Sequence, residues 1–133
     1  MKGKVLFVCV ENAGRSKMAE AFGKKYGIDC LSAGTVPSDQ VNDMVVDAMK
    51  EIGMDISHDK PKVMTQEMVE GADLVVIMGC SVQDTCPAPI AGAMKKKMVD
   101  WGLDDPKGKS LEEVRIIRDR IEELVRDLSK SDI

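Results

Sequence analysis

Short apolar runs and helix-like segments alternate along this chain. Residues 4–9, "KVLFVC", and residues 72–79, "ADLVVIMG", are almost continuously apolar. Continuous rather than alternating polarity is typical of strands that are covered on both faces. Residues 29–34 and 97–101 are shorter strand candidates. Strands that alternate with helices predict an α/β fold with a parallel sheet.

Three helices are predicted between these strands. Residues 16–26 contain good helix formers and end before Gly27, a common residue after a helix C-terminus. Ser38 is the expected cap of a second helix, whose apolar residues recur at three-and-four spacing as far as Ile52. A short helix is expected over residues 65–70.

The helix near the end of the chain has the strongest pattern. Ser110 and Glu113 have the spacing of a capping box. One apolar stripe follows, made of Leu111, Val114, Ile117, Ile121, Leu124 and Leu128. Together, these elements predict a single domain over residues 1–133. We expect a three-layer, doubly wound α/β fold with a four-stranded parallel sheet flanked by helices.

Composition narrows the class of protein further. Apolar residues make up 44% of the chain and charged residues 32%, a globular balance. No apolar run approaches the roughly 20 residues that span a bilayer, and no secretory cleavage pattern follows the N-terminus. We therefore expect a cytoplasmic protein without a membrane partner. A net charge of -4 and few aromatic residues also argue against nucleic acid as a partner.

The four cysteines, at positions 9, 30, 80 and 86, suggest catalytic thiol chemistry. No CxxC pair occurs and His58 is the only histidine, so the spacing fits no common zinc site. A cytoplasmic chain of this length does not need structural disulfides. We predict no metal and no cofactor.

Cys9 is the candidate nucleophile, because it lies at the carboxyl end of the first strand, at the sheet edge where open α/β sheets bind ligands. The loop before the helix can present its amides to a tetrahedral oxyanion, and Arg15 supplies a guanidinium that matches two oxygens. The predicted oxyanion-binding residues are Glu11, Asn12, Ala13, Gly14, Arg15 and Ser16. The same surroundings favour a thiolate. The alternative is that Cys9 is a small buried hydrophobe and Arg15 a solvated surface charge.

Several motifs together resemble a known family. Cys-x5-Arg-Ser after the first strand, with Asn12 inside the loop and "KMAEAF" after it, resembles the low-molecular-weight protein tyrosine phosphatase superfamily. Four further motifs are similar to the thioredoxin-coupled arsenate reductases of that superfamily: "LSAG" at 31–34, "DAMKEIGMDISHDK" at 47–60, "CSVQDTCP" at 80–87 and "WGLDDP" at 101–106.

The resemblance implies a role for five residues. Cys9 attacks the arsenic of arsenate, Arg15 holds its oxygens, and Asp105 protonates the departing oxygen as a general acid. Cys80 then attacks Cys9 and releases arsenite, and Cys86 attacks Cys80. The resulting Cys80–Cys86 disulfide implies thioredoxin as the electron donor.

Two other functions remain open at this point. A phosphatase of the same superfamily would hydrolyse phosphate monoesters through a Cys9 phosphoenzyme, and an anion sensor would bind without turnover. Some members of the superfamily also bind a potassium ion beside the loop. Asn12, Glu20 and Ser32 stand at corresponding positions, but the segment around Asp59 and Pro61 differs, which is why no metal is predicted.

Overall fold

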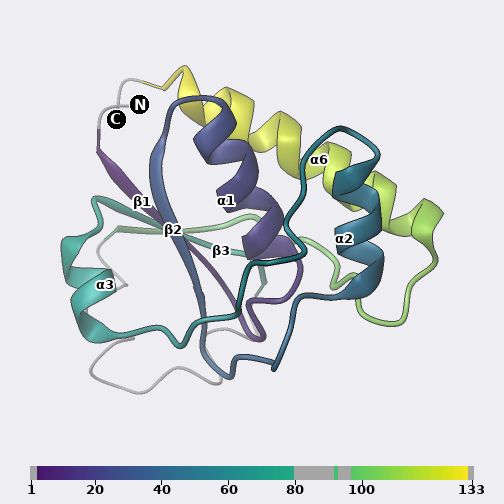
Figure 1. Cartoon of the computed structure of the whole chain (residues 1–133). Coiled ribbons are helices and arrows are strands. Elements are labelled where there is room, and N and C mark those ends of the chain that lie inside the picture. The colour runs from purple at the N-terminus through teal and green to yellow at the C-terminus, as the bar shows by residue number, and fades with distance from the viewer. Residues whose placement is uncertain (1–2, 80–91, 93–96, 132–133) are drawn as a thin grey trace.

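The computed structural model describes residues 3–79, 92 and 97–131. A four-stranded sheet with the order β2-β1-β3-β4 forms its centre, and every neighbouring pair is parallel (Figure 1). The strands are β1 (Lys4–Cys9), β2 (Asp29–Gly34), β3 (Leu74–Ile77) and β4 (Met98–Asp100). The predicted four-stranded parallel sheet is confirmed, although β3 and β4 are shorter than the apolar runs that predicted them.

Helices cover both faces of this sheet (Figure 1). They are α1 (Arg15–Lys25), α2 (Asp43–Lys50), α3 (Gln66–Gly71) and α6 (Leu111–Ser129). Val5 and Phe7 of β1 are buried on the face that α1, α2 and α6 cover. Leu6 and Val8 point to the opposite face and pack with Val69 of α3. The three-layer prediction is therefore confirmed.

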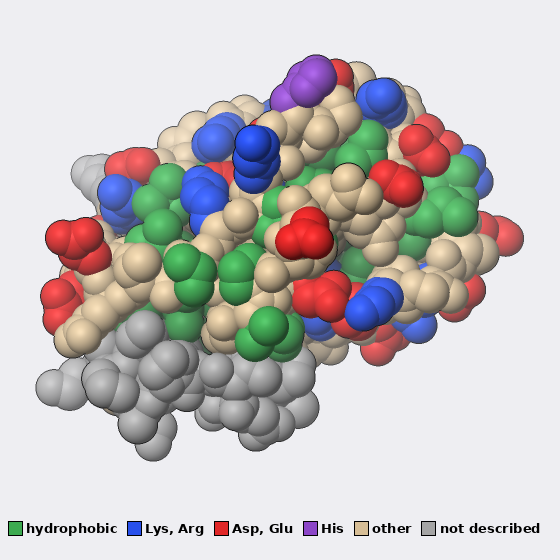
Figure 2. Space-filling model, turned by 60° about the horizontal axis from the view of Figure 1, so that its bottom comes forward, with side chains coloured by type: hydrophobic (Ala, Val, Ile, Leu, Met, Phe, Trp, Pro, Cys, Tyr) green, Lys and Arg blue, Asp and Glu red, His purple; other side chains and the backbone are tan. Residues whose placement is uncertain are grey.

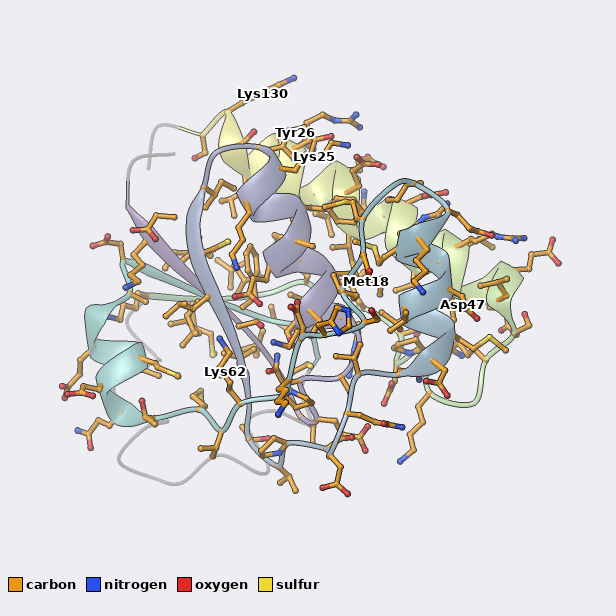
Figure 3. All side chains as sticks on the ribbon, viewed as in Figure 1. Met18, Lys25, Tyr26, Asp47, Lys62 and Lys130 are labelled. Atoms are coloured by element: carbon orange, nitrogen blue, oxygen red, sulfur yellow. The ribbon has the colours of Figure 1, made fainter. Side chains whose placement is uncertain are left out.

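The capping box predicted for α6 is present. The Ser110 hydroxyl accepts a hydrogen bond from the Glu113 amide at 3.2 Å, and the Glu113 carboxylate accepts one from the Ser110 amide at 3.3 Å. Lys25 and Tyr26 at the end of α1 both donate to Glu122 of α6 (Figure 3). These contacts fix α1, which begins at the candidate site. No helix in the described ranges is long and apolar enough to cross a membrane.

The predicted start of the second helix is wrong. Asn42 rather than Ser38 caps α2, because its side-chain oxygen accepts from the amides of Met44 and Val45 at 2.9 and 3.4 Å. The Ser38 hydroxyl instead donates to the Gln40 carbonyl. The backbone before Asn42 pairs with the loop that follows β1, and this long-range pairing prevents the helix from beginning earlier.

The sheet order also places the site. β1 lies between β2 and β3, so the chain leaves β1 and β3 in different directions at their carboxyl ends. Ligands of doubly wound sheets bind in the crevice at such a switch point. Cys9 is the last residue of β1, and Met78 follows the end of β3.

Candidate active site

The segment after Cys9 folds as a loop whose carbonyl groups point away from its centre. Amides from outside the loop bind five of these carbonyls, with the pairs Thr35 to Cys9, Val36 to Val10, Ser38 to Glu11, Asn42 to Ala13 and Met18 to Gly14. A carbonyl that points outward turns the next N–H inward, because the two are antiparallel across a peptide plane. The amides of Glu11 and Gly14 have no acceptor among the residues that the structure describes. The loop is thus a concave set of donors suited to an oxyanion.

The Cys9 sulfur lies at the base of this loop and is surrounded by hydrogen-bond donors. The Asn12 amide donates to it at 3.2 Å, and the Ser16 hydroxyl lies 2.9 Å from it. Ser16 already accepts from the Asn12 side chain at 2.7 Å, which leaves its own proton available to the sulfur. Asn12 has a positive φ of 51° and also accepts from the backbone amide of Lys62, labelled in Figure 3. These hydrogen bonds hold the sulfur at the base of the loop.

Two glycines allow the loop to pack closely against its neighbours. Gly34 pairs with Cys9 in the sheet, and a Cβ there would lie 2.6 Å from the Val10 carbonyl oxygen. A Cβ on Gly14 would lie 2.8 Å from Cγ of Pro106. A side chain on Gly34, the last residue of "LSAG", would therefore collide with the loop. A side chain on Gly14 would collide with Pro106, which follows Asp105.

Arg15 connects three segments of the site. Its Nη1 donates to the carbonyl of Met78 at 2.8 Å and to that of Leu103 at 2.7 Å. Its Nη2 lies 3.9 Å from Oδ2 of Asp105, whose side chain is exposed. The structure therefore brings Asp105 close to the loop that carries Cys9 and Arg15, although about 90 residues separate them in the sequence.

A small cavity of about 20 Å³ lies above Cys9 and extends to Asp105. A single water molecule needs roughly 10–15 Å³ of cavity volume. A cavity of this size therefore suits a small inorganic ion better than an organic substrate. Asn42, Pro106 and Lys107 also line it and were not predicted from the sequence. Two features of the sequence could have indicated them. Pro106 belongs to the "DDP" motif and Lys107 follows it, and Asn42 directly precedes α2.

The positive charge of the site is local. Basic and acidic side chains both occur across the face in Figure 2. Positive potential at the cavity comes instead from the Arg15 guanidinium, the loop amides and the N-terminus of α1. This arrangement suits a small anion.

A buried ion pair supports α1 behind the loop. The side chains of Lys17 and Glu20 are 2% and 5% exposed, and Lys17 Nζ lies 3.7 Å from Glu20 Oε1. That same oxygen accepts from the Ser32 hydroxyl at 2.8 Å. Burial lowers the pKa of Lys17, and the charge of Glu20 opposes the shift. Lys17 could not be identified from the sequence, because its burial results from tertiary packing.

The Lys17–Glu20 ion pair also decides whether a potassium ion could bind beside the loop. Glu20 and Ser32 occupy two of the corresponding positions, but the Glu20 carboxylate already has the Lys17 ammonium on one oxygen and the Lys24 ammonium 3.6 Å from the other. The two lysine ammonium groups already neutralise the negative charge of Glu20 that would attract a potassium ion. The residues present therefore do not fit a potassium ion.

Replacing Lys17 by methionine is expected to lower the free energy of unfolding by about 1–3 kcal/mol, because Glu20 would lose its buried cation and keep only the exposed Lys24 ammonium and the Ser32 hydroxyl as partners. Urea denaturation of both proteins measures this difference. Lys24→Met is the matched control, since it removes a cation from the same carboxylate but its side chain is 66% exposed. The control is expected to cost less than about 1 kcal/mol. Equal losses in the two variants would contradict the buried pair.

Of the other three cysteines, Cys30 lies within the described residues. Cys30 is buried and donates to the Glu20 carbonyl at 3.5 Å, and burial raises the pKa of its thiol to about 11. A thiol of this kind is protonated at neutral pH and is a poor redox nucleophile. Cys80 and Cys86, predicted as resolving residues, lie outside the described residues.

The chain belongs to the low molecular weight phosphotyrosine protein phosphatase family, whose sequence model matches residues 4–131. It is 38% identical to the arsenate reductase of Halalkalibacterium halodurans, over 98% of this chain and 97% of the relative. It is also 38% identical to the arsenate reductase of Brevibacillus brevis, over 90% and 89%. The family resemblance expected from the sequence motifs is confirmed.

Solved structures give the same family and two activities. An arsenate reductase in the phosphate binding state is 35% identical, with a TM-score of 0.81 and 95% of each chain covered. The YwlE arginine phosphatase from Geobacillus stearothermophilus is 26% identical, with a TM-score of 0.84 over 96% of this chain and 91% of that one. The fold is thus shared by reductases and phosphatases.

Proposed function

We propose that this protein is an arsenate reductase that uses Cys9 as its nucleophile. The observation that carries the proposal is the Cys9 sulfur at the base of an anion-sized cavity, held by Asn12 and Ser16 and faced by Arg15. The relatives named arsenate reductase support the choice of arsenate over other oxyanions.

In the first step, the Cys9 thiolate attacks arsenic and an As–S bond forms. One arsenate oxygen departs as water, with Asp105 as the proton donor at the mouth of the cavity. The inward amides and the Arg15 guanidinium stabilise the negative charge that develops on the other oxygens. Arg15 must exchange at least one of its carbonyl partners, on Met78 or Leu103, for an oxygen of the substrate.

In the second step, Cys80 attacks the Cys9 sulfur. A Cys9–Cys80 disulfide forms, the As–S bond breaks, and its electron pair stays on arsenic, which leaves as arsenite. Cys86 then attacks Cys80, which frees Cys9 and leaves a Cys80–Cys86 disulfide. The sequence motif that contains both cysteines supports these roles.

A dithiol protein must reduce this disulfide in each cycle. We take thioredoxin as that donor and the cytosol as the compartment, because thioredoxin exchanges readily with exposed disulfides under reducing conditions. The test of the proposed function is the formation of arsenite from arsenate with thioredoxin, thioredoxin reductase and NADPH. NADPH consumption that does not depend on arsenate, or no arsenite, would contradict it.

Phosphate monoester hydrolysis is the second candidate function. Cys9, Arg15 and Asp105 could catalyse it by the same nucleophilic and acid chemistry, and a solved arginine phosphatase shares the fold. The hydrolysis needs neither Cys80 nor Cys86. Weak ester hydrolysis is therefore expected beside arsenate reduction and does not by itself favour a phosphatase.

Replacing Asp105 by asparagine is expected to lower kcat/KM for arsenate by about 10²-fold, the lower end of what a general acid contributes. The substituted amide keeps the size of the side chain but cannot donate the proton efficiently. Steady-state kinetics in the coupled assay measures the loss. Asp104→Asn is the matched control, because Asp104 is adjacent and exposed and does not line the cavity. An equal loss in both variants would exclude Asp105 as the acid.

A further inference from the structure

Glu11 is an unexpected residue in an anion-binding loop. Its carboxylate lies on the rim of the cavity and accepts a hydrogen bond from Lys107 Nζ at 3.1 Å. Glu11 belongs to the loop that holds Cys9, whereas Lys107 is two residues beyond Asp105. The ion pair therefore joins the anion-binding loop to the segment that carries the acid.

The pair stands on the boundary between two spaces. On one side is the cavity of about 20 Å³ above Cys9, and on the other is an open groove of about 610 Å³. Glu11 and Lys107 line both. Ala13, Asn42 and Pro106 line both spaces as well, and the Pro106 ring leaves no space for a Cβ on Gly14.

This position matters for what the site admits. In a displacement at phosphorus or arsenic, the leaving oxygen departs roughly opposite the attacking sulfur. For arsenate that oxygen leaves as water, which the small cavity and Asp105 can accommodate. For a monoester the oxygen carries an organic group, which must extend past the rim and into the groove. A group that takes this route passes the Glu11–Lys107 pair, because both residues line the cavity and the groove.

We propose that the Glu11–Lys107 ion pair is a specificity gate that favours free inorganic oxyanions over phosphate monoesters. The inference deepens the proposed function and rests on it only for the identity of the natural oxyanion. The side chains of Glu11 and Lys107 are 38% and 70% exposed. An ion pair this exposed is weak, so the gate lowers the affinity for monoesters without excluding them. Lys107 also offsets the carboxylate of Glu11, which would otherwise repel the incoming anion.

The test uses ligand protection of Cys9, which requires no turnover. Iodoacetamide alkylation of Cys9 is followed while inorganic phosphate or phenylphosphonate, a stable monoester analogue, is added. The ratio of the two half-protecting concentrations measures selectivity. Glu11→Gln combined with Lys107→Ala removes the pair without changing the net charge. This double variant is expected to shift the ratio about fivefold towards phenylphosphonate, the most that an exposed ion pair imposes.

The matched control is Asp43→Asn combined with Lys109→Ala. These residues line the same groove and remove the same charges, but they form no ion pair with each other in the described part of the chain. The control is expected to keep the wild-type ratio. An unchanged ratio in the gate variant, an equal shift in the control, or no protection of wild-type Cys9 by phosphate would overturn the gate. Absence of arsenate reduction with a shifted ratio would instead overturn the proposed function and leave the gate in place.

Discussion

Replacing Cys9 by serine is expected to abolish both arsenate reduction and ester hydrolysis. Serine keeps the hydrogen bonds of the loop but is a far weaker nucleophile than a thiolate. A loss of about 10⁴-fold or more is expected, of the order seen when a catalytic nucleophile is removed. The coupled arsenate assay and p-nitrophenyl phosphate hydrolysis measure the two activities.

The control for this variant is Cys30→Ser. Cys30 is also buried, and a serine hydroxyl there can still donate to the Glu20 carbonyl. We expect the control to retain both activities within a fewfold range. Arsenate turnover that survives in Cys9→Ser would show that another thiol starts the reaction.

Replacing Cys80 by serine separates the two activities. The As–S adduct on Cys9 can form, but no thiol is placed to attack Cys9, so arsenate turnover falls to background. Ester hydrolysis is expected to stay near the wild-type rate, because it needs only Cys9, Arg15 and Asp105. The same two assays, run on one preparation, make each activity the control for the other.

Two results would contradict this separation. Normal arsenate turnover in Cys80→Ser would exclude Cys80 from the relay. Loss of ester hydrolysis along with arsenate reduction would indicate that the substitution disturbs the cavity rather than a later step. The Cys86→Ser variant distinguishes the last step, since it should accumulate a Cys9–Cys80 disulfide.

Much of the fold could be predicted from the sequence, because its main features are local patterns. The apolar run that ends at Cys9 is a central strand, and the capping box at Ser110 starts the last helix. The start of α2 could not be predicted in this way. Ser38 is as good a cap as Asn42 by residue type, and pairing with the distant loop decides between them.

The candidate site was predictable only in part, for a related reason. A nucleophile, an arginine and a loop within eight residues form a pattern that sequence alone can reveal. The burial of Lys17 and the ion pair between Glu11 and Lys107 depend on segments that meet only in the folded chain. The role of Asp105 is predicted from a motif of the family, whereas its distance from Arg15 depends on the folded structure.

A single turnover of the fully reduced protein with arsenate and no external reductant shows whether the three cysteines form the relay. Arsenite is quantified by chromatography, and peptide mapping after acid quenching locates the disulfide. The expected products are one arsenite per chain, a Cys80–Cys86 disulfide and a free Cys9. No arsenite, or an end product in which Cys9 is still joined to Cys80 while Cys86 is free, would contradict it.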